Sequence, residues 1–274
     1  MTDATLPAAP RVPLSPFVFR FGRVGDMVML TAVLHALHCR YGAPCHVVAM
    51  DRWIDDLYAG HPDVAACWHV PRKVPFAFGL AWPALLRELR RSDPAPIYVC
   101  EHHRRQVPRI RRLLALGRID PDRCLFIEDI PGTERLWLDC LLEFAAGTPA
   151  AVRASEYPQP VPRDLWRPQL QVAPCERQAA RAGVVAAPCG LTRLFALCEL
   201  AQSMISIDTG PAHAAAALGT PLVVLYGIQS ARVWLPRSGT DSPVLALEAD
   251  RVEKIHPEAV LAAWRTLPGE RSRR

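Results

Sequence analysis

Lysine is nearly absent from this 274-residue chain, whose 32 basic residues are all arginine except Lys73 and Lys254. The chain also has no apolar run that approaches the roughly 18 residues of a membrane-spanning helix. Residues 1–16 are rich in proline and alanine, without the basic and apolar regions of a signal peptide. We therefore expect a flexible N-terminal arm over residues 1–16 and a cytoplasmic protein.

The cysteines lack the patterns of a disulfide framework or a zinc site. There are nine, an odd number, and no two form a CxxC pair. The sequence also contains no cluster of metal ligands. We expect chemistry that requires neither a metal nor a cofactor.

The charge is the next informative feature. The formal net charge is +5, and guanidinium groups match phosphate oxygens in pairs. An anionic partner such as a nucleotide, a phospholipid or a nucleic acid would suit this charge. A genome rich in G and C would also favour arginine codons, so the net charge alone does not decide between these explanations.

Hydrophobic periodicity divides the chain into two α/β units. Apolar strands alternate with amphipathic helices over residues 17–150, a pattern typical of a parallel sheet covered on both faces. Residues 151–174 are rich in proline and without a clear period, so they are expected to link two domains. A smaller α/β unit then follows over residues 175–274, with strands expected at 184–188, 204–207, 222–227 and 244–248 and a closing helix at 257–267.

The first candidate site is the turn GRVGD, residues 22–26, between the first strand and the first helix. Ligands of open α/β sheets bind outside the carboxyl ends of the strands, where Gly22 and Gly25 would let backbone approach a ligand. Asp26 would be the first carboxylate there, placed as a general base. The alternative is a tight turn with Asp26 as a helix cap. The turn is neither a GxGxxG motif nor a P-loop.

The second candidate site is DTGPAH, residues 208–213, at the same position in the second unit. Thr209 and Gly210 can offer N–H and hydroxyl donors to a phosphate, and Pro211 suits a first helical turn. His213 would lie in that turn. Helix capping needs only one such residue, and His213 would then be an ordinary polar side chain. The turn instead combines a carboxylate, a hydroxyl, a glycine and an imidazole, which favours a ligand role.

The two turns and their surroundings resemble glycosyltransferase family 9, the ADP-heptose:lipopolysaccharide heptosyltransferases. The similar segments are residues 22–42, 60–70, 206–227 and 233–239. The resemblance implies a GT-B fold, in which two Rossmann-like domains face each other across a central cleft, here with a shortened second domain. The N-terminal domain would hold an anionic glycolipid acceptor, and the C-terminal domain would hold the nucleotide-sugar. The resemblance also implies that the closing helix, residues 257–267, packs back across the domain boundary.

The resemblance also assigns roles to residues. Asp26 would deprotonate the acceptor hydroxyl in an inverting transfer, and the turn around it would face the acceptor and phosphate through Gly22, Arg23 and Gly25. The donor would be held by Asp208, Thr209, Gly210, Pro211 and His213. The partners would thus be a nucleotide-sugar and a lipopolysaccharide-core acceptor, with peripheral contact to the inner membrane and no nucleic acid.

The second unit departs from the family pattern. Family members carry a further strand–helix pair there and a lysine near the donor, whereas no lysine lies between Lys73 and Lys254. Arg193 or Arg232 could supply the missing charge, although a guanidinium does not copy an ammonium group. Three hypotheses follow: an active glycosyltransferase, a relative that binds nucleotide or glycolipid without catalysis, and an unrelated nucleotide-binding α/β enzyme that reuses the same turn.

Overall fold

The computed structural model describes residues 12–70, 81–127, 135–159, 167–181 and 190–268. The strand expected at residues 184–188 lies outside these ranges. Residues 12–16 of the expected arm lie inside them and belong to the first unit, since Leu14 is buried and forms a parallel bridge with Gly42.

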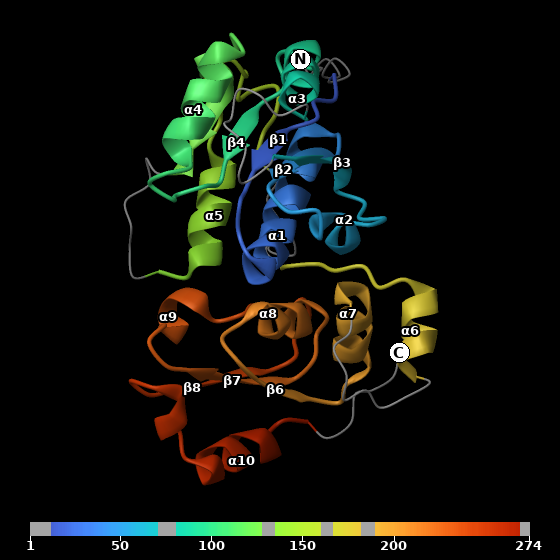
Figure 1. Ribbon diagram of the computed structural model, residues 1–274, viewed down its shortest axis with the longest axis vertical. Coiled ribbons are helices and arrows are strands. Elements are labelled where there is room, and N and C mark those ends of the chain that lie inside the picture. Colours follow the sequence, from blue (N-terminus) through green and yellow to red (C-terminus); the bar gives the residue numbers. More distant parts are fainter. Residues whose placement is uncertain (1–11, 71–80, 128–134, 160–166, 182–189, 269–274) are drawn as a thin grey trace, which may run out of the picture.

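The first unit is a five-stranded parallel sheet in the order β3-β2-β1-β4-β5 (Figure 1). Short runs of apolar and β-branched residues form buried strands of the kind found inside a parallel sheet. The strands are β1 (Phe17–Phe19), β2 (Cys45–Ala49), β3 (Val64–His69), β4 (Ile97–Val99) and β5 (Cys124–Phe126).

Helices cover both faces of this sheet. Side chains of α1 and α5 share one apolar cluster, and side chains of α3 and α4 share another on the opposite face. The helices are α1 (Val24–Tyr41), α2 (Ile54–Leu57), α3 (Ala81–Arg91), α4 (Val107–Leu116) and α5 (Trp137–Ala146), with a 3₁₀ turn η1 (Pro121–Arg123).

The second unit is smaller and contains a parallel sheet in the order β6-β7-β8. Its strands are β6 (Met204–Ile207), β7 (Leu222–Tyr226) and β8 (Val244–Glu248). Its helices are α6 (Pro174–Arg181), α7 (Leu191–Leu200), α8 (Gly210–Ala217), α9 (Ala231–Trp234), the 3₁₀ turn η4 (Val252–Lys254) and α10 (Pro257–Arg265). The two α/β units, the second one shortened, confirm the predicted fold class.

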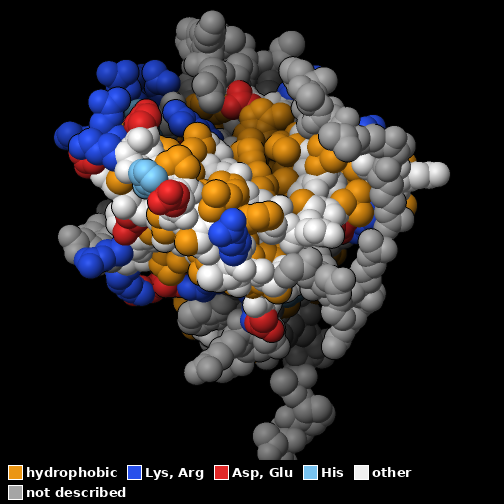
Figure 2. All heavy atoms as spheres, turned by 90° about the horizontal axis from the view of Figure 1, so that it is seen from below, with side chains coloured by type: hydrophobic (Ala, Val, Ile, Leu, Met, Phe, Trp, Pro, Cys, Tyr) orange, Lys and Arg blue, Asp and Glu red, His pale blue; other side chains and the backbone are white. Residues whose placement is uncertain are grey.

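The described sheet of the second unit ends at β6, which leaves apolar side chains at its edge. Ile205 is 43% and Ile207 50% exposed. Figure 2 views this end of the molecule from below and shows hydrophobic side chains at the surface between charged ones. Among the described residues, β6 therefore forms an apolar edge of the second sheet.

The closing helix differs from our expectation. The resemblance predicted that residues 257–267 pack back across the domain boundary. Figure 1 instead shows α10 on the side of the second sheet that faces away from the first unit. α10 packs against β7, and Trp264 donates a hydrogen bond to Ser203 at 2.8 Å, so the expectation is wrong for the described residues.

Helix α1 is fixed at its C-terminal end by buried polar contacts. The guanidinium of Arg40 donates hydrogen bonds to the carbonyls of Gly147 and Tyr157, at 2.7 and 3.1 Å. The carboxylate of Asp63 accepts hydrogen bonds from His35 and His38, at 3.0 and 2.6 Å. The His35 bond raises the pKa of that imidazole. These contacts set the position of α1, whose other end carries the GRVGD turn.

The two units are joined by packing and by polar contacts. A single apolar cluster runs from α1 and α5 into Phe195 of α7 and Ala214 of α8. Arg237 of the second unit pairs with Asp139 of α5 at 2.6 Å. The backbone N–H of Gln169 donates to the Thr31 hydroxyl of α1 at 2.7 Å. The helices α1 and α8 are thereby held against each other.

Candidate active site at the junction of the two units

Asp26 lies in the first turn of α1, directly after β1, and 19% of its side chain is exposed. Its Oδ2 accepts a hydrogen bond from the backbone N–H of Arg23 at 2.9 Å, so it caps the helix. Its Oδ1 accepts a bond from Arg20 Nη2 at 2.5 Å. Gly22 makes room for this arrangement, because a Cβ there would lie 2.3 Å from the Cβ of Asp26. Asp26 therefore does cap α1, as the alternative reading predicted. Its carboxylate also lies at the carboxyl end of the first sheet.

Arg20 is a site residue that the sequence analysis missed. It is 2% exposed and donates a second hydrogen bond to the carbonyl of Cys100 at 2.7 Å. Its guanidinium lies 5.7 Å from the ring centre of Trp137 and 3.2 Å from His102 Nδ1. Burial and the nearby Arg20 charge both lower the pKa of His102. The only signal in the sequence was an arginine inside the apolar run FVFRFG.

The two motif turns contact each other directly. A Cβ on Gly25 would lie 2.7 Å from His213 Cδ2, and a Cβ on Gly210 would lie 2.7 Å from Val24 Cβ. Both distances are shorter than van der Waals contact. Gly25 and Gly210 therefore allow the N-terminal ends of α1 and α8 to approach. Both glycines were predicted from the sequence to face a ligand, which stays a prediction; in this structure each also packs against the other unit.

His213 is enclosed at this contact, with 6% of its surface exposed. Burial lowers the pKa of His213 to about 4, although the charge of Asp26 opposes the shift. The imidazole is therefore neutral near pH 7, and its Nε2 lies 3.8 Å from Asp208 Oδ1. His213 therefore lies between the turn that carries Asp26 and the turn that carries Asp208.

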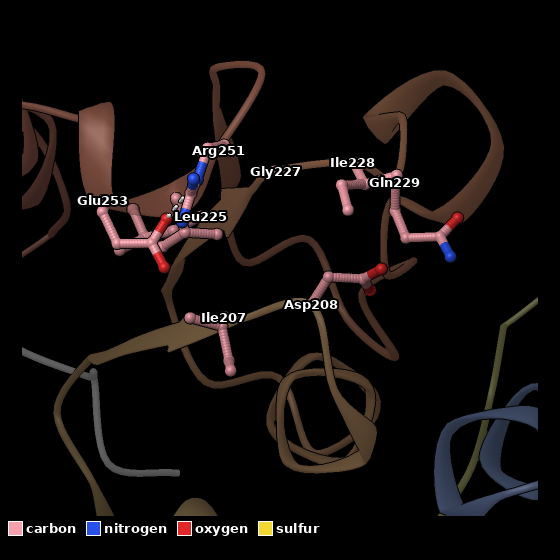
Figure 3. A pocket seen from close by; sticks show the side chains of 9 residues that line it. Ile207, Asp208, Leu225, Gly227, Ile228, Gln229, Arg251 and Glu253 are labelled. Carbon is pink, nitrogen blue, oxygen red and sulfur yellow. Dashed lines mark ion pairs between the residues drawn. The ribbon is translucent and has the colours of Figure 1, made fainter.

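A pocket of about 630 Å³ opens at the carboxyl ends of the second sheet (Figure 3). Its apolar walls are Ile207, Leu225, Ile228 and Val252, with Gly227 beside them, and its polar groups are Asp208, Gln229, Arg251 and Glu253. Of the five predicted donor residues only Asp208 lines it. Partial burial raises the pKa of Asp208.

The other predicted donor residues lie beside this pocket. Thr209 is the N-cap of α8 and Pro211 lies in its first turn, as expected from their order in the sequence. The Thr209 hydroxyl donates to the carbonyl of Ile207 at 3.2 Å. Sequence reasoning missed Gln229, Arg251 and Glu253, which follow β7 and β8. The sequence indicated them only weakly, because the one clue was that each follows the end of a predicted strand by a few residues.

The arginines considered in place of the missing lysine have different positions. Arg193 of α7 pairs with Glu176 of α6, with 3.4 Å between Nε and Oε2. Arg232 lies in the last turn of the short helix α9. Arg251 is the arginine that lines the pocket, where its Nε lies 3.5 Å from Glu253 Oε2.

Residues 169–259, which include the pocket and the DTGPAH turn, match the family model of glycosyltransferase family 9 (heptosyltransferase). The predicted resemblance to glycosyltransferase family 9 is confirmed. The match covers the second unit and ends within α10. No curated protein matches the chain significantly.

Solved structures of family 9 enzymes share the fold over nearly the whole chain. The Escherichia coli ADP-heptose lipopolysaccharide heptosyltransferase II is 18% identical, with a TM-score of 0.66, covering 92% of this chain and 98% of that one. A family 9 glycosyltransferase from Veillonella parvula is 12% identical, with a TM-score of 0.62 and 94% coverage of both chains. The E. coli heptosyltransferase WaaC with ADP is 14% identical, with a TM-score of 0.62, covering 92% of this chain and 99% of that one.

Two further observations concern the described residues. None of the described helices is both long and apolar enough to cross a membrane. Within the same ranges, no group of three or more histidine, cysteine, aspartate or glutamate side chains is arranged to hold a metal ion.

Proposed function

We propose that this chain is an inverting glycosyltransferase that moves a sugar, with heptose from ADP-heptose as the first candidate, onto a lipopolysaccharide-core or related glycan acceptor. The observation that carries the proposal is the continuous series of contacts from Asp26 through Gly25 and His213 to Asp208 and its pocket. An acceptor-side carboxylate and a donor-side pocket therefore meet at one junction. The family match over the pocket-bearing unit supports the same assignment.

The donor would be held by groups of two kinds. The apolar walls of the pocket suit a nucleoside, and Asp208 and Glu253 can accept hydrogen bonds from sugar hydroxyls. The diphosphate would take the N-terminal end of α8, where the partial positive charge of the helix dipole favours an anion. Arg251 lines the same pocket and carries the positive charge that a diphosphate requires.

The transfer would proceed by a single displacement. The acceptor hydroxyl loses its proton to the Asp26 carboxylate while its oxygen bonds to the anomeric carbon from the face opposite the diphosphate. The bond from that carbon to the diphosphate oxygen breaks, its electron pair stays on the diphosphate, and the configuration inverts. N–H donors and positive charge fixed in advance stabilise the leaving group. We propose that the reaction takes place in the cytoplasm and needs no metal or cofactor.

Arg20 positions the base in this account. Its guanidinium is buried and bonded both to Asp26 and to the Cys100 carbonyl, so it restrains the carboxylate. The restrained carboxylate lies at the carboxyl end of the first sheet, where it would take the proton of the acceptor hydroxyl.

The second candidate function is binding of a nucleotide or glycolipid without turnover. It is favoured by the small size of the second sheet, to which the described residues contribute three strands, and by the absence of lysine between Lys73 and Lys254. The two candidates predict the same binding behaviour and differ only in chemistry.

Asp208→Ala tests the donor site. We expect the affinity for ADP-heptose, measured by isothermal titration calorimetry, to fall roughly ten- to a hundredfold, as for loss of one hydrogen bond to a charged group. Asp241→Ala is the matched control, because that carboxylate is 92% exposed and pairs only with Arg167 among the described residues. Unchanged affinity of folded Asp208→Ala would show that the DTGPAH turn is structural. His213→Ala is less informative, because removing a buried ring leaves a cavity at the junction.

A further inference from the structure

Two tryptophans from different units meet beside the candidate active site. Trp137 begins α5 in the first unit, and Trp234 ends α9 in the second unit. Their ring centres lie 6.2 Å apart, with an angle of 42° between the ring planes. Figure 1 shows α9 next to the end of α5 at which Trp137 lies. The reaction described above uses neither side chain.

Trp137 contacts the guanidinium group that holds the proposed base. The central carbon of the Arg20 guanidinium lies 5.7 Å from the centre of the Trp137 ring, within the range of a cation–π contact. The Nη atoms of Arg20 donate to Asp26 and to the Cys100 carbonyl, whereas its buried Nε has no hydrogen-bond partner among the described residues. The indole ring therefore adds a restraint on Arg20 that is not a hydrogen bond.

His102 contacts the same two side chains. Its ring centre lies 4.8 Å from that of Trp137, with 60° between the ring planes. Its Nδ1 lies 3.2 Å from Nη1 of Arg20. Burial, together with the charge of Arg20, lowers the pKa of His102, so the imidazole is neutral near pH 7 and its Nδ1 can accept this hydrogen bond. The indole and the guanidinium are therefore held together by one imidazole.

The other indole is connected to the pocket by a short segment. Gln229 lines the pocket, and α9 begins two residues later at Ala231. The N–H of Ala231 donates to Glu248 of β8 at 2.6 Å, and the hydroxyl of Tyr226 in β7 donates to the Trp234 carbonyl at 3.1 Å. The position of Trp234 is therefore fixed by the two strands that lead into the pocket.

We propose that Trp137 is a positioning residue for sugar transfer, whose ring holds Arg20 and thereby the Asp26 carboxylate. Its contact with Trp234 connects this position to the donor pocket. The inference rests on the proposed function, because it assigns the ring a part in that reaction. Displacement of a reacting group by about 1 Å can lower a rate roughly a hundredfold. The Trp137 ring should therefore affect kcat and leave donor affinity unchanged.

The kinetic test compares Trp137→Phe with Trp137→Leu. Both changes remove volume from the site, and only Trp137→Phe keeps an aromatic ring. Because Nε1 of Trp137 is buried and has no hydrogen-bond partner among the described residues, the ring and not its N–H makes the contacts. We expect Trp137→Phe to retain kcat within about threefold and Trp137→Leu to lower it at least about tenfold, both with near wild-type KM for the donor.

Trp82→Leu is the matched control, because Trp82 is buried in the apolar cluster on the opposite face of the first sheet. It should lower the stability of the fold and leave kcat per folded molecule unchanged. Wild-type kcat in folded Trp137→Leu would overturn the proposal. An equal loss of kcat in Trp137→Phe, or in Trp82→Leu, would overturn it as well.

Fluorine NMR of protein labelled with fluorotryptophan gives a readout that needs no turnover. The signals of Trp137, Trp234 and Trp82 are each assigned by their loss in a Phe variant. Asp26→Asn removes the charge partner of Arg20 and should shift the Trp137 signal but not the Trp82 signal. An unmoved Trp137 signal would contradict the proposed contact.

The same labelled protein tests the connection to the pocket. Saturating ADP should shift the signals of Trp234 and Trp137, and this response should weaken in Asp208→Ala. A Trp137 signal that ignores bound ADP would overturn the connection. Failure of the proposed function would be seen differently, as a wild-type chain that transfers no sugar while both shifts remain.

Discussion

Asp26→Asn should lower the rate of sugar transfer roughly a hundredfold or more while the protein still binds its donor. The amide oxygen of asparagine can still accept the hydrogen bond of the Arg23 N–H, so the start of α1 keeps its cap. What is lost is the carboxylate that takes the proton of the acceptor hydroxyl. Single-turnover kinetics with a verified acceptor, combined with calorimetric titration of the donor, separates these two effects.

A control is needed because Asp26 also neutralises the buried Arg20. Asp139→Asn weakens another aspartate–arginine pair at the junction, with Arg237, and removes no group from the proposed chemistry. We expect this variant to retain near-normal turnover. Near-normal turnover of folded Asp26→Asn would show that the base has been assigned wrongly.

Gly25→Ala should separate the two motif turns and reduce both stability and activity. Its Cβ would lie 2.7 Å from His213 Cδ2, and the enclosed imidazole has little space to move. Overpacking of this kind typically costs about 1–3 kcal/mol of folding free energy. We expect a lower free energy of unfolding in urea and at least about a tenfold fall in turnover. Gly190→Ala is the control, since a Cβ there meets no atom within 4 Å.

A second substitution identifies the cause of the Gly25→Ala effect. His213→Ala in the same chain removes the ring that the new methyl group meets, so the double variant should lose less stability than the two single changes together. Purely additive losses would mean that Gly25 acts through its backbone. Wild-type stability of Gly25→Ala would contradict the close packing of α1 on α8.

The sequence predicted the parts of the fold that depend on local pattern. Alternating apolar runs and amphipathic segments identified the parallel strands and most of the helices, because burial on one or both faces leaves a periodic trace. The order of turn residues also placed Asp26 and Thr209 correctly at the starts of α1 and α8. Each of these inferences needed only a few consecutive residues.

Features that depend on distant contacts could not be predicted in the same way. A glycine in a turn indicates close approach, but not which surface approaches, and so the packing of Gly25 against His213 and of Gly210 against Val24 could not be predicted. Arg20 was missed because its partners Asp26 and Cys100 come together only when β1 and β4 pair. The predicted position of α10 was wrong because it rested on likeness to the family and not on a local sequence pattern.

The central claim is that this junction transfers a sugar, and the most direct measurement is mass spectrometry of a lipopolysaccharide-core acceptor after incubation with the protein and ADP-heptose. The account predicts an acceptor heavier by one heptosyl residue, with one ADP released for each residue transferred and inverted configuration at the new linkage. Saturable binding of ADP without any modified acceptor or consumed donor would contradict it. That result would make this chain a binding protein on a glycosyltransferase family 9 fold.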